Sequence, residues 1–585
     1  MEQQLQQALD ATSRTSSHTS PEDPVASNVA DTRPQNDNSS ESLDFMECTS
    51  SSESPSECVQ ESERLKLPPL QEIVPVVDEF FSNYNTIMPL FDQPTFMRML
   101  SNWYVPSSPQ STAVWAAVNI AMALGYRCAL KQPGNLDALV DDQKVQHHMR
   151  NVQSVVSELV TREEDLLGLQ VLLGMVVLFL GTREPKPASV LIGTAVRLAH
   201  RMHLHDKESL QSFSPDIARQ RTRLFWMTYT LDKDISLKST TPSFQMDIDI
   251  DLPLPEHNPD DGAGIMCATN GSKFNYFRAR VELSHISGKV YDQLYSTRSR
   301  KISPQDRQMR VMRLENMLEN WRLSLPPEFQ MDSALRCLDP LPVVHMSLLY
   351  HTHFMAVTMT HGVYSDNADW VKKVSLYSRS LMQDLDAAPS PCGKQNPPLP
   401  QGWAKCVELS RSCMRLFADS PKTDCSIWSN SCAHLSGLII ILANMFVWPD
   451  HQLVAADNEL ANQALQLFEQ MLSVHKQETL HRMHAVVKEL HRRAMEAVEE
   501  ANALRREKQA AATVTEVRDT DLPFGTQVEE DVDFLQGMEA TDIEGALTSN
   551  LTPGSMFSAT WNLSNLEGLQ ADVGEAGMPT GLRYY

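Results

Sequence analysis

Histidines in the second half of the chain are the first candidates for chemistry, because imidazole rings bind metal ions and move protons. Four of them fall within one expected helix, 341–361: His345, His351, His353 and His361. His351 and His353 are two residues apart, so they point to different sides of a helix and do not converge on one ion. The pattern indicates histidines on a helix surface or satisfied within a core. The same interpretation applies to a group at the end of another helix, namely His200, His203 and His205.

Cysteines offer a second possible metal site. They are spaced in two pairs, Cys406 with Cys413 and Cys425 with Cys432. Seven positions place the members of a pair on one face of a helix but two turns, ~10.5 Å, apart. A zinc ion binds its thiolate ligands at ~2.3 Å, so neither pair can share one ion. We therefore expect small buried thiols and no metal site.

Catalytic and cofactor-binding motifs are missing from the sequence. It contains no phosphate-binding loop, no dinucleotide-binding glycine turn, no nucleophile elbow and no His-Glu-x-x-His zinc motif. Two carboxylate pairs, Asp141-Asp142 and Asp260-Asp261, lack the further carboxylates at helical spacing that a metal-activating cluster needs. The sequence thus predicts no catalytic, cofactor-binding or metal-binding residue, and no enzyme.

The elements that would position any site are helices. Apolar residues recur at three- and four-residue spacing along most of the chain, whereas the alternating run 246–255 is bounded by prolines and suits an extended connector. The polar stretch 131–149 indicates a loop or a surface helix, and 152–180 indicates one or two helices. We expect an all-α body, with further helices over 73–84, 96–103, 113–126, 188–205, 224–235, 274–297, 304–324, 341–361, 401–418, 428–447 and 455–508.

The net charge of −24 is concentrated in the two ends of the chain. Residues 1–65 contain 13 acidic and 3 basic residues, residues 513–585 contain 13 and 2, and the intervening 66–512 contain 48 and 45. A body so close to neutral has little positive charge to spare for phosphates, which provide most non-specific nucleic-acid affinity. We therefore expect any contact with DNA to be indirect.

The two ends are expected to be disordered tails. Residues 1–65 are rich in Ser, Thr and acidic residues, a composition that cannot bury enough apolar surface to fold. Residues 513–585 mix acidic residues with bulky ones such as Phe534 and Trp561, which is typical of an activation segment that binds a coactivator. The alternative is a solvated tail with incidental aromatic residues. Between the tails we expect a helical domain at 66–475 and an amphipathic helix at 476–512.

That amphipathic helix offers a possible dimer interface. Its apolar residues form a heptad seam: Leu480, Met483, Val487, Leu490, Ala494, Ala497, Ala501 and Leu504. The seam suits a homodimer or packing against the body, and its small alanines favour packing. Two basic groups, at 492–493 and 505–508, suit either a nuclear import signal or a solvated helix face.

Membrane and secretory signals are not apparent. The start of the chain lacks the basic and apolar regions of a signal peptide. The longest apolar runs, 166–180 and 438–448, fall short of the ~20 residues that a membrane span needs. Ten cysteines scattered through a long chain favour free thiols in a reducing compartment. We expect a soluble intracellular protein with no membrane contact.

The most specific pattern lies in residues 191–255. It consists of Gly193, Ala195, Arg197, Ala199, Leu204 and His205, then Arg221 and Arg223 before Phe225-Trp226, then Asp232, and an extended segment, Asp247–Pro253. This pattern resembles the fungal-specific transcription factor domain, the middle homology region of fungal zinc-cluster regulators. Weaker similarity extends from about Leu70 to about Leu472. The resemblance implies a helical regulatory domain in a nuclear transcription regulator, often of nutrient use or secondary metabolism.

Two departures from that family stand out. Thr240-Thr241-Pro242 occupies the place of the family's usual Gly-Arg-Pro. The family reads DNA through a basic module in which six cysteines hold two zinc ions, whereas only Cys48 and Cys58 precede the domain here. We expect a regulator that needs a DNA-binding partner or a missing N-terminal module, together with transcriptional coactivators. The alternative is a helical scaffold or co-regulator that works by protein–protein contacts alone.

Charged residues within the pattern lead to a structural prediction. Arg197 and Asp232 lie in otherwise apolar helices, and we predict that they form a buried ion pair. The alternative is that each side chain faces solvent. Gly193, on the same helix as Arg197, predicts the close approach of a neighbouring element.

Overall fold

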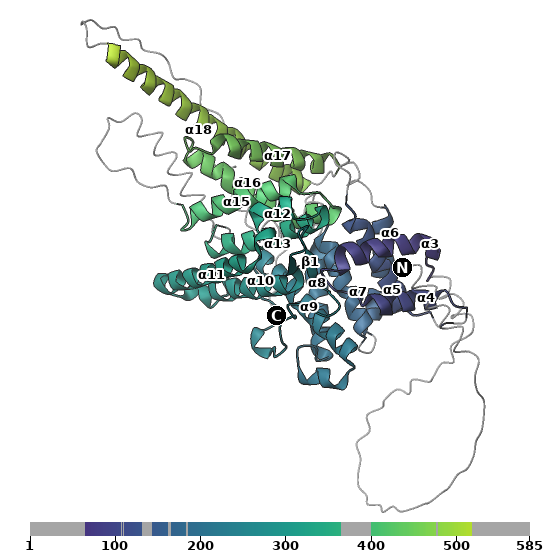
Figure 1. Ribbon diagram of the computed structural model, residues 1–585. Helices are drawn as coiled ribbons and strands as arrows, with labels where there is room; N and C mark the ends of the chain where they lie inside the picture. The colour runs from purple at the N-terminus through teal and green to yellow at the C-terminus, as the bar shows by residue number, and fades with distance from the viewer. Residues whose placement is uncertain are drawn as a thin grey trace, which may run out of the picture.

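The structure is a computed structural model, shown in Figure 1. It describes residues 65–517, except for 107, 109, 131–142, 162–164, 183–184, 364–398 and 475–477. The described chain is built almost entirely of helices, which confirms the predicted all-α body. Both predicted tails lie largely outside the described residues, as do Asp141 and Asp142.

Three helices form the N-terminal part: α3 (Leu70–Phe80, continued by a π-helical turn, Phe81–Asn85), α4 (Gln93–Trp103) and α5 (Thr112–Cys128). The Asp92 carboxylate caps α4 by accepting a hydrogen bond from the backbone N–H of Thr95 at 3.0 Å. Helix α5 is buried on nearly all sides, since α3, α6 and α7 pack around it. A Cβ atom on Gly125 would lie 2.3 Å from the Val76 carbonyl oxygen, so α3 and α5 meet at this glycine.

The next helices are α6 (Gln143–Thr161), α7 (Leu166–Leu180), α8 (Lys186–Arg201) and α9 (Pro215–Ser239). The region 152–180 thus forms parts of two helices. Helix α7 has no polar face because it runs through the core. The Leu90 carbonyl ties α7 to α9, since it accepts hydrogen bonds from Gln170 at 2.7 Å and from Gln220 at 2.8 Å.

The middle of the chain contains small elements that the sequence did not indicate. A short 3-10 turn (Asp247–Asp249) lies within the predicted connector, and β1 (Ile265–Cys267) pairs antiparallel with β2 (Lys273–Asn275). Helices α10 (Tyr276–Val290), α11 (Pro304–Ser324), α12 (Met331–Cys337) and α13 (Pro340–Thr360) follow. Three-residue strands and a seven-residue helix are too short to produce a readable hydrophobic period.

The C-terminal part contains α15 (Trp403–Asp419), α16 (Asp424–Val447), α17 (Val454–Val474) and α18 (Glu478–Val517). The single helix predicted over 455–508 is therefore wrong, because α17 and α18 are separate helices that pack on each other and on α16. These C-terminal helices share a hydrophobic core of their own, next to the larger core formed by the preceding helices.

Helix α16 has the length and composition of a membrane span, in contrast to the shorter apolar run seen in the sequence. It has 24 residues, and 78% of its most apolar window is buried inside the protein. The core helix of a globular protein has these same properties.

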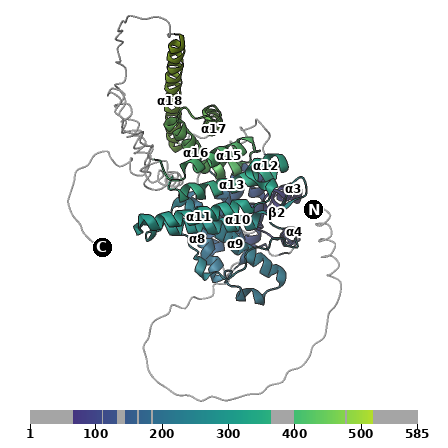
Figure 2. The same ribbon diagram turned by 60° about the vertical axis from the view of Figure 1, so that its left-hand side comes forward.

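Helix α18 is partly packed and partly free. Its seam residues Leu480, Met483, Val487 and Ala494 are buried against the neighbouring helices, whereas Leu504 is 53% exposed. Figure 2 shows the C-terminal half of α18 projecting from the body. Packing explains the first half of the seam, and the homodimer stays a prediction.

Candidate functional site

Helix α9 holds the segment that follows it, residues 243–253, with polar side chains of its second half. The Trp226 indole Nε1 donates a hydrogen bond to the Pro253 carbonyl at 2.9 Å. One turn further along, the Tyr229 hydroxyl donates to the Asp247 carboxylate at 2.9 Å. The predicted extended connector is therefore fixed along its length to one face of α9.

Asp232 fixes the start of this segment. Its carboxylate accepts hydrogen bonds from the Ser243 hydroxyl and from the backbone N–H groups of Phe244, at 3.2 Å, and Gln245, at 3.0 Å. The residue is only 1% exposed. Burial raises the pKa of Asp232, although the three hydrogen bonds oppose that shift. Asp232 therefore acts as an internal cap for a turn.

A second acidic residue, Asp247, joins the segment to two helices. Its carboxylate lies 3.0 Å from the Lys233 ammonium of α9 and 3.1 Å from the His285 imidazole of α10. Lys233 also donates to the Gln245 carbonyl at 2.8 Å. Burial would raise the pKa of Asp247, but the hydrogen bond from His285 and the charge of Lys233 outweigh it, so the pKa lies below its ordinary value.

The close approach predicted at Gly193 is confirmed. A Cβ atom there would lie 3.1 Å from the Phe244 ring, which packs across α8 at this point. Gly193 and Asp232 thus act on the same turn. Gly193 leaves room for the Phe244 side chain, and Asp232 accepts a hydrogen bond from the Phe244 backbone N–H.

The predicted ion pair between Arg197 and Asp232 is wrong. Arg197 is exposed on α8, while Asp232 is satisfied by backbone donors instead of a cation. The buried ion pair is formed by Asp234, two residues further, whose carboxylate binds the Arg280 guanidinium and accepts from the Ser284 hydroxyl at 3.3 Å. The sequence did not show which acid forms the ion pair, because Asp232 and Asp234 both follow Trp226 on a helix that is buried on almost every side.

Thr240 lies in the turn after α9, at the position where the family usually has the glycine of Gly-Arg-Pro. This residue ends the helix with φ +53°, a left-handed conformation that favours glycine. Its N–H still donates to the Leu237 carbonyl at 3.2 Å, and the Thr241 N–H donates to that of Ser236 at 3.0 Å. The turn is therefore kept, although a β-branched residue has replaced the glycine.

The two arginines before Phe225-Trp226 have separate structural roles. Arg221 donates to the Met202 carbonyl at the end of α8, and its guanidinium lies 4.0 Å from the centre of the Phe213 ring. Arg223 forms a two-point pair with Asp261, at 2.6 and 2.7 Å. Arg221 and Arg223 thus have partners within the protein, whereas Arg197, the other arginine of the pattern, is exposed.

Residues 77–323 match the fungal-specific transcription factor domain. All of the interactions just described lie within this range. The chain contains a fungal-specific transcription factor domain. The match covers the N-terminal part of the predicted 66–475 region, whose outer boundaries stay a prediction.

Three relatives show how far the similarity extends. An ABC-transporter-regulating transcription factor of Aspergillus fumigatus is 30% identical over 437 residues, or 74% of this chain and 48% of the relative. The fusaridione A cluster transcription factor of Fusarium heterosporum is 26% identical and covers 73% of this chain and 78% of its own length. An uncharacterized transcriptional regulatory protein of Schizosaccharomyces pombe is 24% identical over 44% of this chain and 34% of its own length. The chain spans about half the length of the Aspergillus relative.

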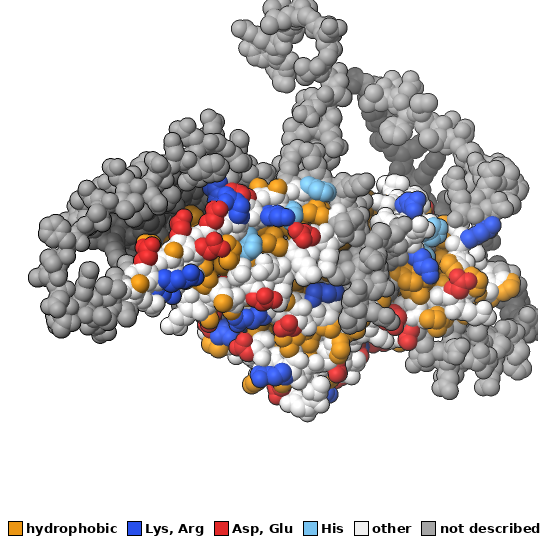
Figure 3. Space-filling view, turned by 90° about the horizontal axis from the view of Figure 1, so that it is seen from above, with side chains coloured by type: hydrophobic (Ala, Val, Ile, Leu, Met, Phe, Trp, Pro, Cys, Tyr) orange, Lys and Arg blue, Asp and Glu red, His pale blue; other side chains and the backbone are white. Residues whose placement is uncertain are grey.

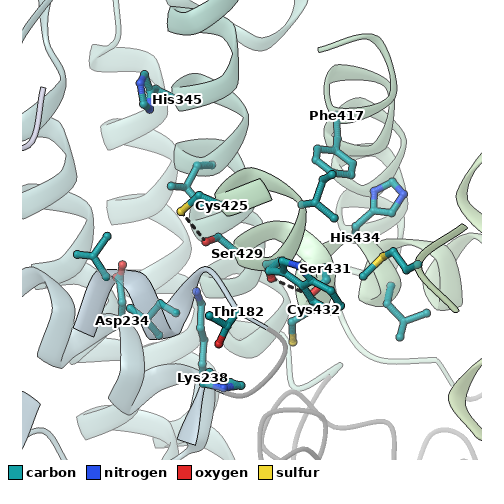
Figure 4. Close-up of a pocket in the computed structure, with 18 of the residues that line it drawn as sticks. Thr182, Asp234, Lys238, His345, Phe417, Cys425, Ser429, Ser431, Cys432 and His434 are labelled. Carbon is teal, nitrogen blue, oxygen red and sulfur yellow. Dashed lines mark hydrogen bonds between the residues drawn. The ribbon is translucent and has the colours of Figure 1, made fainter. Parts of the chain in front are cut away.

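A pocket of about 180 Å³ lies where the transcription factor domain meets the C-terminal helices. One wall comes from α7, α9 and α10 of the domain, and the other comes from α15 to α18. Most of the lining is apolar and belongs to both hydrophobic cores. In Figure 4, Asp234 and Lys238 of α9 lie on one side of the pocket, and Phe417 and His434 lie on the other.

The polar groups of the pocket have shifted pKa values. Burial lowers the pKa of His345 to about 4 and that of His434 to about 3, so both are neutral at pH 7. Burial raises the pKa of Cys432 to about 11, and it lowers the pKa of Lys238. A buried apolar cavity with a few polar groups is the usual form of a small-molecule site.

The other histidines named from the sequence lie in the core of α13 or near it. His351 faces the Phe417 ring, with ring centres 5.5 Å apart, and its Nδ1 is 2.7 Å from the Ser347 carbonyl. His353 points elsewhere and stacks on Trp321 at 5.2 Å. The prediction that His351 and His353 face different sides is confirmed. His361 is buried, 3.9 Å from Glu315.

The histidine group at the end of α8 stays together but is more open to solvent. His203 is exposed, and the rings of His200 and His205 lie 4.9 Å apart. Burial lowers the pKa of His200. Over the described part of the chain, no group of three or more His, Cys, Asp or Glu residues could hold a metal ion.

The seven cysteines in the described residues are free thiols, but the sequence did not reveal one contact between them. Cys406 and Cys413 are buried on α15, as predicted, whereas Cys425 and Cys432 of α16 are only partly buried. Cys425 of α16 forms a hydrogen bond with Cys128 of α5, which lowers the pKa of Cys425 to about 7 despite its burial. No local spacing could reveal this pair, because its members lie on helices that are far apart in the sequence.

Proposed function

We propose that this protein is a nuclear transcription regulator whose helical body acts as a regulatory domain and not as an enzyme. The observation that carries the proposal is the match of residues 77–323 to the fungal-specific transcription factor domain. The names of its relatives, which are transcription factors and transcriptional regulatory proteins, support the same class.

In this proposal the described helices do not read DNA themselves. Positive and negative side chains are interspersed on the face shown in Figure 3. Two arginines of the central motif are occupied by partners within the protein, since Arg221 donates to the Met202 carbonyl and Arg223 pairs with Asp261. Arg280 of α10 is likewise paired with Asp234. A surface that neutralises phosphates needs unpaired basic residues. A DNA-binding partner, or a module outside the region that matches, would therefore supply specific recognition.

The target genes are proposed from two relatives. One is named for the regulation of an ABC transporter and another for the fusaridione A cluster. We accordingly propose that this protein controls a metabolic or secondary-metabolite gene set.

Chromatin immunoprecipitation of the tagged full chain, combined with RNA sequencing of a deletion strain, tests the proposal. We expect enrichment at a small set of promoters and altered transcripts from the same genes. Nuclear exclusion of the tagged chain, or chromatin signal at background level, would contradict the proposal.

Purified full chain separates the two ways of reaching DNA. We expect no sequence-specific shift of promoter fragments by the chain alone, and a shift when nuclear extract supplies a partner. Specific binding by the chain alone would overturn the indirect mechanism. Transcript changes without any occupancy of the promoters would favour the scaffold or co-regulator instead.

Activation by the C-terminal tail is a separate part of the proposal. Residues 513–585 joined to an unrelated DNA-binding domain should raise reporter output, because their acidic residues keep the bulky ones available for a coactivator groove. Replacement of Phe534, Leu535 and Trp561 by Ala should remove that output. No activity from the fusion would discard the activation role.

A further inference from the structure

Among the described residues, the pocket between the two cores is lined by two basic side chains, Arg280 and Lys238, but by only one acidic side chain, Asp234. Asp234 and Arg280 line it and neutralise each other as a buried ion pair. Lys238, one helical turn after Asp234, also lines the pocket and forms no ion pair or hydrogen bond with any residue that the structure describes. The charged groups along α9 and α10 therefore leave the ammonium form of Lys238 without a neutralising partner among the described residues at the cavity.

The remaining titratable groups do not cancel that charge. His345 on α13 and His434 on α16 are neutral at pH 7, and the Cys432 thiol, which lies near Lys238, is protonated. Tyr276 stays protonated because burial raises its pKa. The Cys128 thiol and the Arg127 guanidinium lower the pKa of Cys425, and the positive charge of Arg127 would compensate a thiolate formed there.

A second group in the pocket lacks a partner. His434 is 9% exposed, and its Nδ1 atom is buried without a hydrogen bond to the described part of the protein. Buried polar atoms in folded proteins are almost always satisfied by protein, water or ligand. Together, Lys238 and His434 leave two polar groups available to a molecule in an otherwise apolar cavity.

We propose that this pocket binds a small apolar molecule with a single acidic group, held as a carboxylate by Lys238. The apolar part would lie among Ile235, Leu438 and Phe468, which line the pocket from both cores. An engineered cavity of roughly 150 Å³ takes up benzene, so about 180 Å³ suits one aromatic ring or a short aliphatic chain. A carboxylate desolvated beside an ammonium group forms a strong charge-assisted hydrogen bond.

Such a ligand would join the two parts of the body. Its acidic group contacts α9, the helix that carries the family pattern, and its apolar part contacts α16 and α17, outside the matched range. A ligand that binds the folded protein and not the unfolded chain stabilises the folded arrangement of these two parts. The site therefore goes beyond the proposed transcriptional role and does not depend on it.

Isothermal titration and thermal unfolding of the purified full chain test the site, with four probes. Benzoate and octanoate carry the acidic group, benzyl alcohol is a neutral match, and benzylamine is a cationic match. We expect the two carboxylates to bind at least about tenfold more tightly than the alcohol, with no measurable binding of the amine. Equal affinity for benzoate and benzyl alcohol, or no binding of either carboxylate, would overturn the proposal.

Substitutions at the pocket locate the bound molecule. Lys238→Met keeps the length and apolar stem of the side chain and should abolish the preference for carboxylates, while Lys273→Met, at an exposed position on β2, should leave it unchanged. Ala464→Phe should fill the cavity and block all probes. If the folded Lys238→Met protein retained its preference for benzoate over benzyl alcohol, the carboxylate would bind elsewhere. These readouts measure binding alone, so they can fail while the transcriptional proposal holds.

Discussion

The buried carboxylate of Asp232 accepts a hydrogen bond of 3.0 Å from the backbone N–H of Gln245, thirteen residues further along the chain. It accepts two more from Ser243 and from the N–H of Phe244. A single side chain of α9 thereby ends the turn that leads into the extended segment. This relationship explains the acid six residues after Trp226 without any contact to DNA or ligand.

Asp232→Ala should lower the free energy of unfolding by about 3 kcal/mol. The substitution removes the carboxylate that accepts three hydrogen bonds: the Phe244 N–H loses its acceptor, and the Gln245 N–H keeps only its 3.2 Å bond to the Ser243 hydroxyl. Hydrogen bonds to a charged group contribute roughly 1.5–3 kcal/mol each. Urea unfolding followed by circular dichroism measures the change. Arg197→Ala is the control, because Arg197 is exposed and should change stability by no more than about 0.5 kcal/mol. Equal losses in both variants would contradict this account.

Thr240→Gly should stabilise the protein by about 1 kcal/mol. Thr240 has φ +53°, where a Cβ atom is strained and glycine is not. Thr240→Ala keeps the Cβ atom and should give no comparable gain. Thermal unfolding of the two variants decides the matter, and a gain as large for Ala as for Gly would show that backbone strain is not the cause.

Gly125→Ala should destabilise the protein by several kcal/mol. The new Cβ atom would lie 2.3 Å from the Val76 carbonyl oxygen, so α3 and α5 would have to separate. Gly168→Ala, also within a helix, meets nothing closer than 3.6 Å and should be neutral or slightly stabilising. Denaturant midpoints compare the pair. A small loss at position 125 would mean that the two helices do not meet there.

Stability should fall as the pH decreases from about 6.5 to about 4. Burial lowers the pKa of His351 and of His353 to about 4, so the unfolded chain binds protons in this range that the folded chain does not. Each such histidine adds a slope of up to about 1.4 kcal/mol per pH unit, and its contribution is fully present above the unfolded pKa of about 6.5.

His353→Gln isolates that effect from the titration of carboxylates. The variant should show a shallower dependence of unfolding free energy on pH than the unaltered protein between pH 4 and 6.5. His257→Gln is the control at an exposed position, and it should leave the slope unchanged. An identical slope in the His353 variant would contradict the buried, neutral histidine.

Periodicity was sufficient to predict several of the long helices. Helix α11, for example, spans 304–324 as predicted, because its apolar residues and the flanking prolines mark both ends. The break between α17 and α18 was missed in the helix predicted over 455–508, since both flanks continue a helical period, although the amphipathic helix predicted at 476–512 begins close to the start of α18. The hairpin of β1 and β2 was missed because three residues on each strand contain little pattern.

The candidate site was harder to predict from the sequence than the fold. The pattern at 191–255 identified Gly193 and Asp232 as special, and the structure confirms close packing at the glycine. The predicted partner of Asp232, Arg197, was nevertheless wrong, because backbone N–H donors are present in almost every residue and cannot be identified from residue types. The pocket joins side chains from helices far apart in the sequence, so no local motif could reveal Lys238 beside Cys432.

The pocket also bears on how this regulatory region can be exchanged between proteins. One of its walls lies within residues 77–323, while Phe417, Leu438 and Phe468 lie well beyond the end of that range. A chimera that transferred only the matched range would expose part of the larger hydrophobic core, would lack the C-terminal core altogether and would lose more than half of the cavity lining. We therefore expect the smallest portable unit to be the whole body, from Leu65 to the packed half of α18.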